Sequence, residues 1–410
     1  MGAWLLLGTT NCANTVQGTE GDGGILRDAA PLHDVLAAQE ASVVDVPRPP
    51  RCTVQSLDGG PFVTALAEPV LPDFFVRMSD GTVRAQGLNG FRRLGLGVEG
   101  NVNTAAPIEG LSNVEEVVVS LHWANCSRHC DGTVRCWGLN QYGLLGTGHA
   151  GDEACQGTSS MVPCRARPTL VEGLDDVVQL SPGVLSFCAL RGDGSVWCWG
   201  IRQPLLGDNL EEAPRPVRST RVSDVVQLYA YHAGHLVRHR DGRYESIGVD
   251  QPATIPAEAT IDSPVLPDHV CYRLPDATVR CVGANAYGQL GNGRASAQRE
   301  HSPQDPGLRD VRAVYASIGL SCAVLGDRTV WCWGRVRDEL EAVPTSELCA
   351  TRDGAVRCAR RPTRVQGIDQ VERLFTSSHG ACALRLDHSV WCWGLWTPDG
   401  VPTRPTPLRW

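Results

Sequence analysis

The chain has 410 residues and a net charge of −8, and all 37 of its basic residues are arginines. The acidic balance argues against nucleic-acid binding, which needs a cationic surface, and the lack of lysine excludes Schiff-base and P-loop lysine chemistry. With 17 cysteines the chain is either exported and disulfide-bonded or a carrier of metal or iron–sulfur clusters.

Residues 1–50 are predicted to be a targeting remnant followed by a flexible tether. A short apolar stub precedes Cys12, which is therefore the candidate for lipidation, although the stub lacks the basic region and full apolar stretch of a secretory signal. The rest of this segment is polar and punctuated by Gly and Pro. No stretch reaches the roughly 20 apolar residues that cross a membrane, so we expect no transmembrane segment.

Residues 51–410 are predicted to be a single repeat domain. Seven similar strands end in glycine, at spacings between 35 and 62 residues: Gly87, Gly138, Gly200, Gly248, Gly283, Gly334 and Gly394. Each unit contains a glycine-rich loop, one strand, and a hairpin that ends in the glycine strand. Short β-branched strands with frequent turn signals predict an all-β array, and radial stacking of such units buries both faces of every sheet.

Three motifs recur in a fixed order, for example "LNQYGLLGTG", then "GLDDVVQLS", then "CALRGDGSVWCWG". Together they resemble the regulator of chromosome condensation repeat over about residues 70–400. The resemblance implies an all-β, seven-bladed β-propeller. The cysteine-rich form is similar to the exported bacterial branch of that family.

Five cysteine pairs are spaced ten residues apart and are centred on an aspartate: Cys126/Cys136, Cys188/Cys198, Cys271/Cys281, Cys322/Cys332 and Cys382/Cys392. An odd-length loop with an Asp-Gly predicts a three-residue turn in which Gly132 or Gly194 takes the left-handed position. The cysteines then oppose each other as a non-hydrogen-bonded pair, with Cα atoms roughly 4.5–5.5 Å apart, which suits a disulfide.

Two further pairs, Cys155/Cys164 and Cys349/Cys358, are spaced nine residues apart. For Cys349 and Cys358 the centre falls between Asp353 and Gly354, which predicts a two-residue loop with the cysteines directly opposite each other. None of these cysteine pairs has the C-x2-4-C spacing of a zinc-binding knuckle. The C-x-x-C motif of redox enzymes is absent. Reduced buried cysteines and metal remain the alternatives to disulfides.

Cys52 and Cys130 have no hairpin partner, and we expect them to pair with each other if the N-terminal strand closes the ring near the second unit. Tryptophans two residues apart, as in "WCW", share the strand face opposite the cysteine between them. We interpret these tryptophans as packing between blades, the alternative being an aromatic platform for a ligand.

Two units contain insertions, at residues 149–167 and 348–358, that lie at the same phase of the repeat and hence on the same face of a ring. We hypothesise a rigid, two-pronged binding face, against the alternative of neutral loop drift. The candidate partner-binding residues are His149, Asp152, Glu153, Met161, Arg165, Arg352 and Asp353.

Catalytic, cofactor-binding and metal-binding residues are not predicted, because no hydrolase, zinc-protease or dinucleotide motif is present. His232, His235 and His239 are interpreted as surface histidines rather than a metal site. The sequence therefore predicts a monomeric, non-catalytic, extracellular or cell-envelope propeller that presents loops to a protein or glycan partner. The alternatives are a nucleotide-exchange regulator of a small GTPase, which the resemblance implies, and a carbohydrate-active propeller enzyme.

Overall fold

A computed structural model describes most of the repeat region. The described residues are 62–67, 73–120, 123–148, 152–156, 160–201, 204–206, 212–231, 234–248, 255–263, 265–266, 268–335, 348–351, 354–377, 380–393 and 405–408. The chain divides into two compact units, residues 1–42 and 43–410, and every described residue belongs to the second. The expected tether, Cys12 and Cys52 lie outside the described residues.

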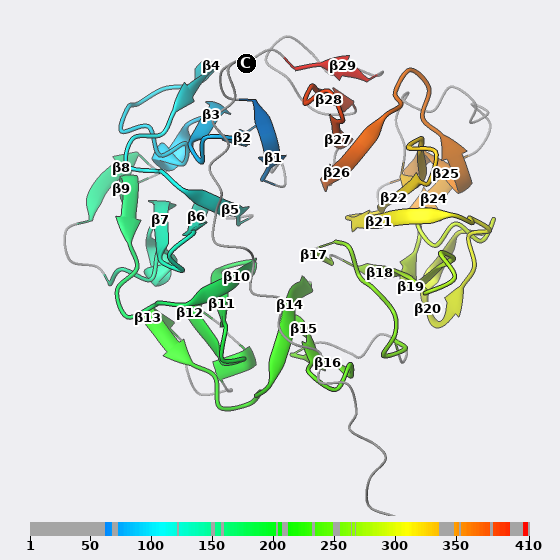
Figure 1. Cartoon of the computed structure of the whole chain (residues 1–410), viewed down its shortest axis with the longest axis horizontal. Coiled ribbons are helices and arrows are strands. Elements are labelled where there is room, and N and C mark those ends of the chain that lie inside the picture. Colours follow the sequence, from blue (N-terminus) through cyan, green and yellow to red (C-terminus); the bar gives the residue numbers. More distant parts are fainter. Residues whose placement is uncertain are drawn as a thin grey trace, which may run out of the picture. The chain divides into compact units, whose positions relative to one another are not determined.

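The described strands form seven sheets that follow one another around a central axis as the blades of a β-propeller (Figure 1). Blade 1 contains β1 (Val63–Leu66), β2 (Phe74–Met78), β3 (Val83–Gly87) and β4 (Val102–Pro107). Blade 2 contains β5 (Val114–Val119), β6 (Ala124–His129), β7 (Val134–Leu139), β8 (Glu153–Gln156) and β9 (Met161–Leu170). Blade 3 contains β10 (Val177–Pro182), β11 (Ser186–Arg191), β12 (Val196–Ile201) and β13 (Glu212–Arg218).

Blades 4 to 7 complete the ring. Blade 4 contains β14 (Val225–Tyr231), β15 (Gly234–His239), β16 (Tyr244–Ile247) and β17 (Val265–Leu266), and blade 5 contains β18 (His269–Arg273), β19 (Val279–Asn285) and β20 (Ser296–Gln304). Blade 6 contains β21 (Val311–Ser317), β22 (Leu320–Leu325), β23 (Val330–Arg335), β24 (Leu348–Thr351) and β25 (Gly354–Arg364). Blade 7 contains β26 (Val371–Ser377), β27 (Gly380–Arg385), β28 (Val390–Trp393) and β29 (Thr406–Pro407). The predicted all-β, seven-bladed propeller is confirmed.

The hairpin between the second and third strands of a blade has the predicted three-residue turn. In blade 2 the backbone N–H of His129 donates to the carbonyl of Thr133 (2.9 Å), and Gly132 has φ +77°. The Asp131 carboxylate accepts hydrogen bonds from the backbone N–H and the hydroxyl of Thr133, at 3.0 and 2.7 Å, and the hydroxyl bond is the main cause of the lowered pKa of Asp131. The turn is thus stabilised within three residues of sequence, which is why it repeats.

Six disulfides are described. Five join the ten-spaced pairs, whose cysteines oppose each other in the strand register with Cα atoms 4.0–4.1 Å apart, slightly closer than expected: Cys126–Cys136, Cys188–Cys198, Cys271–Cys281, Cys322–Cys332 and Cys382–Cys392. The sixth is Cys155–Cys164. Cys130 and Cys358 are also disulfide-bonded, but the side chains of Cys52 and Cys349 are not among those described, so these two pairings stay predictions.

The insertions form fifth strands rather than free loops, which corrects the expected hairpin register. Cys349 lies opposite Val356, and Thr351 closes the turn against Gly354, so Cys349 and Cys358 are not directly opposed. In blade 2 the same offset places Cys155 opposite Val162, and its disulfide with Cys164 joins diagonal neighbours with Cα atoms 5.9 Å apart. The register differs because β9 and β25 also pair with the third strand of their blade, which sets their position.

The tryptophan strands lock neighbouring blades together, as predicted. The indole N–H of the fully buried Trp199 donates to the carbonyl of Leu144 (3.0 Å) in the glycine loop of the preceding blade. A Cβ on Gly146, whose φ is +67°, would lie 2.9 Å from the Trp199 ring. Trp137 and Trp333 make the equivalent bonds to the carbonyls of Arg93 and Gln289, at 2.9 and 2.8 Å.

The disulfides lie on the opposite side of each sheet and pack against the following blade. Cys126 and Cys136 share an apolar cluster with Trp199, and Cys322 and Cys332 share one with Trp393. Cys382 and Cys392 contact blade 1 through residues that include Val76. Blades 2, 3, 6 and 7 therefore have a tryptophan on one side of the sheet and a disulfide on the other.

Replacing Trp199 by Phe is expected to lower the free energy of unfolding by about 2–4 kcal/mol, because a buried carbonyl loses its donor and a void remains. The matched control is Trp197→Phe, since Trp197 is half-buried and its indole N–H reaches only the hydroxyl of Ser195 (3.2 Å); it should cost less than about 1 kcal/mol. Urea titration under non-reducing conditions measures both, and equal losses would contradict the interlock.

Ala277→Gly is expected to raise the free energy of unfolding by about 1 kcal/mol, because Ala277 holds the left-handed turn position with φ +60°. The control is Ala106→Gly within β4, which should lower stability by roughly 0.5–1 kcal/mol. The same urea titration measures both variants. If Ala277→Gly lowers the free energy of unfolding as much as the control does, Ala277 is not strained in its left-handed conformation.

Candidate binding face and central pocket

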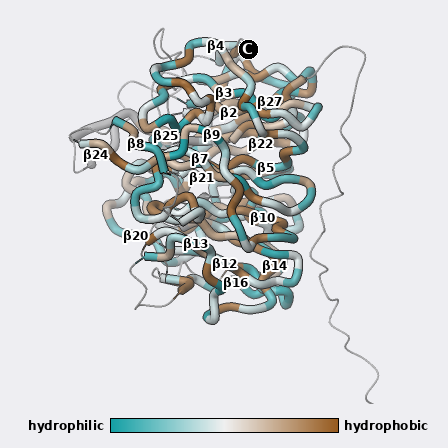
Figure 2. Tube along the Cα trace, turned by 90° about the vertical axis from the view of Figure 1, so that its left-hand side faces the viewer, coloured by the Kyte–Doolittle hydropathy of each residue, from teal (hydrophilic) through white to brown (hydrophobic). Residues whose placement is uncertain are grey.

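The strand directions define two faces of the ring. The first, the insertion face, carries the turns between first and second strands, the loops between third and fourth strands, and the tips of the hairpins β8–β9 and β24–β25. The second, the Asp-turn face, carries the aspartate turns between second and third strands. Figure 2 shows β8 and β24 on the same side of the ring, as the repeat phase predicted.

Exposed apolar side chains gather on the insertion face. Nine large apolar side chains are exposed among the described residues, and six of them lie in the loops, turns or hairpin of this face: Leu88, Val98, Tyr142, Met161, Val184 and Ile318. They belong to blades 1, 2, 3 and 6 of the ring. The Asp-turn face has Leu386 in its blade 7 turn.

Aromatic residues on the insertion face were not among the predicted site residues. Phe91 stacks on Trp123 with ring centroids 4.5 Å apart, and the guanidinium of Arg335 lies 5.5 Å from the ring centre of Tyr287. Phe91, Tyr142 and Tyr287 each follow the loop asparagine by two residues. This recurring spacing in the sequence could have identified the aromatic residues in advance. Aromatic residues and arginine are enriched in protein interfaces.

Two predicted partner-binding residues instead hold the insertion hairpin to its blade. Asp152 accepts a bond from Arg165 Nε (2.9 Å) and one from Asn140 Nδ2 (2.7 Å), and its side chain is 8% exposed. Asn140 also fixes the glycine loop by accepting the N–H of Leu145 (3.0 Å). The hairpin base and the glycine loop are therefore one rigid assembly, in which Asp152 and Arg165 bond to each other.

The other predicted residues divide into two groups. Glu153 pairs with Arg92 of blade 1 (2.8 Å) and so links two blades, while Met161 has 56% of its surface exposed near the hairpin tip. His149, Arg352 and Asp353 lie outside the described residues. Met161 is thus the predicted residue that remains open to a partner among those described.

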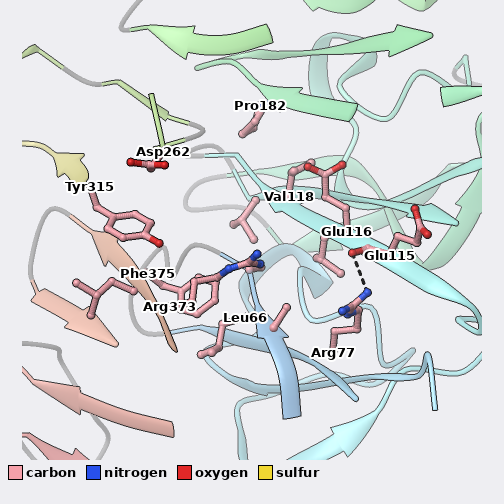
Figure 3. Close-up of a pocket in the computed structure, with 15 residues that line it drawn as sticks. Leu66, Arg77, Glu115, Glu116, Val118, Pro182, Asp262, Tyr315, Arg373 and Phe375 are labelled. Carbon is pink, nitrogen blue, oxygen red and sulfur yellow. Dashed lines mark hydrogen bonds between the residues drawn. The ribbon is translucent and has the colours of Figure 1, made fainter. Parts of the chain in front are cut away.

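A pocket of about 380 Å³ lies where the innermost strands converge (Figure 3). Its wall combines apolar and charged side chains: Leu66, Val118, Pro182, Tyr315 and Phe375, with Arg77, Glu115, Glu116, Asp262 and Arg373. These residues come from blades 1, 2, 3, 6 and 7 and from the segment before β18. A site assembled from so many distant segments leaves no local signature in the sequence.

Arg77 is the partly buried cation of this pocket. Its Nε donates to the hydroxyl of Thr64 (3.0 Å) and its Nη1 to the carbonyl of Glu115 (3.3 Å). Burial lowers the pKa of Arg77, and the nearby charge of Arg373 lowers it further. Two guanidinium groups therefore face one small space.

The carboxylates of the pocket are engaged with other groups. Glu115 and Glu116 both pair with Arg128, and Glu116 also accepts the backbone N–H of Leu180 (3.1 Å) in the next blade. Burial raises the pKa of Glu116 and of Asp262. Asp262 pairs with an arginine of β18 (3.3 Å) and accepts a backbone N–H from β21 (3.0 Å).

An aspartate–histidine–serine arrangement in blades 5 and 6 is structural. His269 Nδ1 lies 2.7 Å from Asp268 Oδ1, and its Nε2 lies 2.6 Å from Ser321 Oγ. The Ser321 hydroxyl also lies 2.8 Å from the carbonyl of Gln289. His269 and Ser321 are fully buried. Without access for a substrate, this serine cannot serve as a nucleophile.

The interpretation of His235 and His239 as surface residues is wrong, because both are buried. Burial lowers the pKa of His235 to about 4, and its Nε2 lies 3.5 Å from Cys188 Sγ in the neighbouring blade. His239 bridges the carbonyl of Ser223 and the carboxylate of Glu245, each at 3.0 Å. His232 lies outside the described residues. Within the described ranges, no cluster of three or more His, Cys, Asp or Glu residues could hold a metal ion.

Seven sheets around one axis define a repeat β-propeller, in which a buried tryptophan on the third strand of blades 2, 3 and 6 bonds to the preceding blade. The regulator of chromosome condensation (RCC1) repeat model matches residues 131–190, which confirms the resemblance seen in the sequence. The chain thus contains one matched repeat of this kind, at residues 131–190, within a propeller of seven blades.

Two solved structures share this fold. Prp20p from Saccharomyces cerevisiae, described with its binding properties to Gsp1p and histones, has 18% identity and a TM-score of 0.64, covering 85% of this chain and 90% of that chain. Yeast RCC1 (Prp20) bound to Kap60 has 16% identity and the same TM-score, covering 85% of each chain. Both are similar in fold. In the part of the chain that the structure describes, no helix is long and apolar enough to span a membrane.

Proposed function

We propose that the protein is an exported, non-catalytic propeller that binds a protein partner on its insertion face. The observation that carries the proposal is the concentration of exposed apolar side chains on this face, six of the nine among the described residues. Interfaces draw most of their binding energy from a few apolar, aromatic and arginine anchors on rigid supports.

The insertion hairpins supply the rigidity that such anchors need. Met161 lies on a hairpin that is held by the Cys155–Cys164 disulfide and by the buried Asp152–Arg165 pair. A hairpin whose backbone is already held in place loses little backbone conformational entropy on binding. The hairpin of blade 6 has the same register offset and lies on another part of the same face.

Export is supported by the disulfides. Six are described, and they are spread over five blades and one insertion. Disulfides of this density form in oxidising compartments and are rare in reducing cytosol. We therefore place the protein outside the cell or in the cell envelope, acting as a monomer.

The double variant Met161→Asp, Ile318→Asp is expected to weaken partner capture at least about tenfold, because both changes put charge on the apolar face. The intact, oxidised protein is used to capture partners from extracellular and cell-envelope material, and recovery is compared by quantitative mass spectrometry.

The matched control is Leu386→Asp, Leu170→Asp, which adds the same charges at two exposed apolar sites away from the insertion face. The control should recover the same partner as the unmodified protein. Loss of that partner in the control, with retention in the insertion-face variant, would place binding on the other side of the ring.

A second candidate function is regulation of a small GTPase, favoured by the RCC1 repeat match and by the similarity in fold to Prp20p, which is described as binding Gsp1p. Such a regulator works in a reducing cytosol, where the paired cysteines would be thiols.

A thiol count on the native, unreduced protein separates the two functions. For the exported propeller we expect few of the 17 cysteines to react with a thiol reagent after denaturation without reductant. A count near 17 would support the cytosolic regulator instead. The same assay after full reduction calibrates the total.

A further inference from the structure

The central pocket contains two guanidinium groups that lack carboxylate partners. Figure 3 shows Arg373 reaching from β26 into the middle of the pocket, while Arg77 enters from β2. Arg77 is bonded to the neutral oxygens of Thr64 and Glu115. Among the described residues, Arg373 makes no hydrogen bond or ion pair, and it is exposed.

Arg373 differs from the residues at its position in blades 2 and 3. Glu116, Gln179 and Arg373 occupy the same register position in the innermost strands of blades 2, 3 and 7. Glu116 and Gln179 each accept a backbone N–H from the next blade, that of Leu180 (3.1 Å) and that of Leu228 (3.0 Å). A guanidinium has no acceptor and cannot make this structural bond.

The charges around the pocket leave one cation uncompensated. Arg128 pairs with Glu115 and Glu116, and Asp262 pairs with an arginine of β18. The pocket lining itself contains Arg77, Arg373 and the three carboxylates. When the two arginines that pair with those carboxylates from outside the lining are included, the group has four arginines and three carboxylates, and its net charge is +1. A partly buried cation is costly unless an anion compensates it.

The rest of the wall defines the size and polarity of the missing anion. Leu66, Val118 and Phe375 form an apolar side next to the phenol ring of Tyr315. A cavity of about 380 Å³ is at the small end of the usual range for ligand pockets. Planar carboxylates match the fork geometry of arginine.

We propose that this pocket binds a single carboxylate group on a small apolar carrier, held by Arg373 and Arg77. The carboxylate comes either from a free organic acid or from an acidic side chain of a polypeptide that enters the ring. The proposal does not depend on the insertion face, because Arg77 and Arg373 lie in the wall of the central pocket.

Isothermal titration of the full oxidised chain with benzoate tests the proposal. Benzoate is expected to bind, and the neutral isostere benzamide is expected not to. Arg373→Gln should weaken benzoate binding at least about tenfold, which corresponds to 1.4 kcal/mol. Arg218→Gln, an exposed arginine on the outer strand β13, is the matched control and should leave binding unchanged.

Further arms identify the source of the carboxylate. The peptide N-acetyl-Gly-Glu-Gly-amide is compared with its Gln counterpart and with benzoate. Tighter binding of the Glu peptide supports an acidic side chain, and tighter binding of benzoate supports a free acid. Inorganic phosphate is the remaining probe, and a pocket that binds phosphate but neither carboxylate would overturn the proposal.

A measurement on the unmodified protein keeps the test valid even if the Arg373→Gln variant misfolds. In the unmodified protein labelled with 15N-arginine, benzoate should shift the side-chain N–H signals of two arginines, and one of these signals should be missing in Arg373→Gln. The proposal fails if benzoate leaves all arginine signals unchanged, or if Arg373→Gln binds benzoate as tightly as the unmodified protein.

Discussion

The ring depends on one repeated constraint, the burial of a tryptophan indole N–H against the preceding blade. A buried N–H needs an acceptor, and Trp199 finds it only in the carbonyl of Leu144, which belongs to another sheet. The loop that offers this carbonyl must approach the ring closely, which is why Gly146 lacks a side chain. In blades 2, 3 and 6, the tryptophan strand and the glycine loop of the preceding repeat are therefore two halves of a single contact.

In the blades that have both a hairpin disulfide and a buried tryptophan, the disulfide lies on the side of the sheet opposite to the tryptophan side. A bridge across a short hairpin closes a small loop and so contributes limited chain entropy, but the sulfur atoms are buried and pack against the next blade. A slip of the strand by one residue would turn the cysteines to the other side. The disulfide between Cys188 and Cys198 thus fixes the side of the sheet to which Trp199 points. The cysteine and the tryptophan in "VWCWG" therefore depend on each other.

Features set by local sequence could be predicted, and features set by long-range pairing could not. The turn at Asp131 and the opposition of Cys126 and Cys136 follow from spacing alone, and the repeat count gave seven blades. The register of Cys349 was wrong because β25 is positioned by β23 as well as by its own hairpin. Asp152 was predicted to bind a partner protein. Instead, one of its carboxylate oxygens accepts a hydrogen bond from a side chain of the glycine loop.

Polar groups of the propeller differ in whether the protein itself supplies all their hydrogen-bond partners. We interpret fully bonded groups as structural and the others as candidates for ligand binding. Ser321 and His269 resemble catalytic machinery, but both side chains are fully buried and bonded within the protein. Arg373 has the reverse character, since it stands where its counterparts Glu116 and Gln179 join blades and is unable to accept the N–H that they accept. A repeat fold tolerates such a departure only where the blade is held by other contacts. The departure leaves a guanidinium directed at the central pocket, where we propose that a carboxylate ligand binds it.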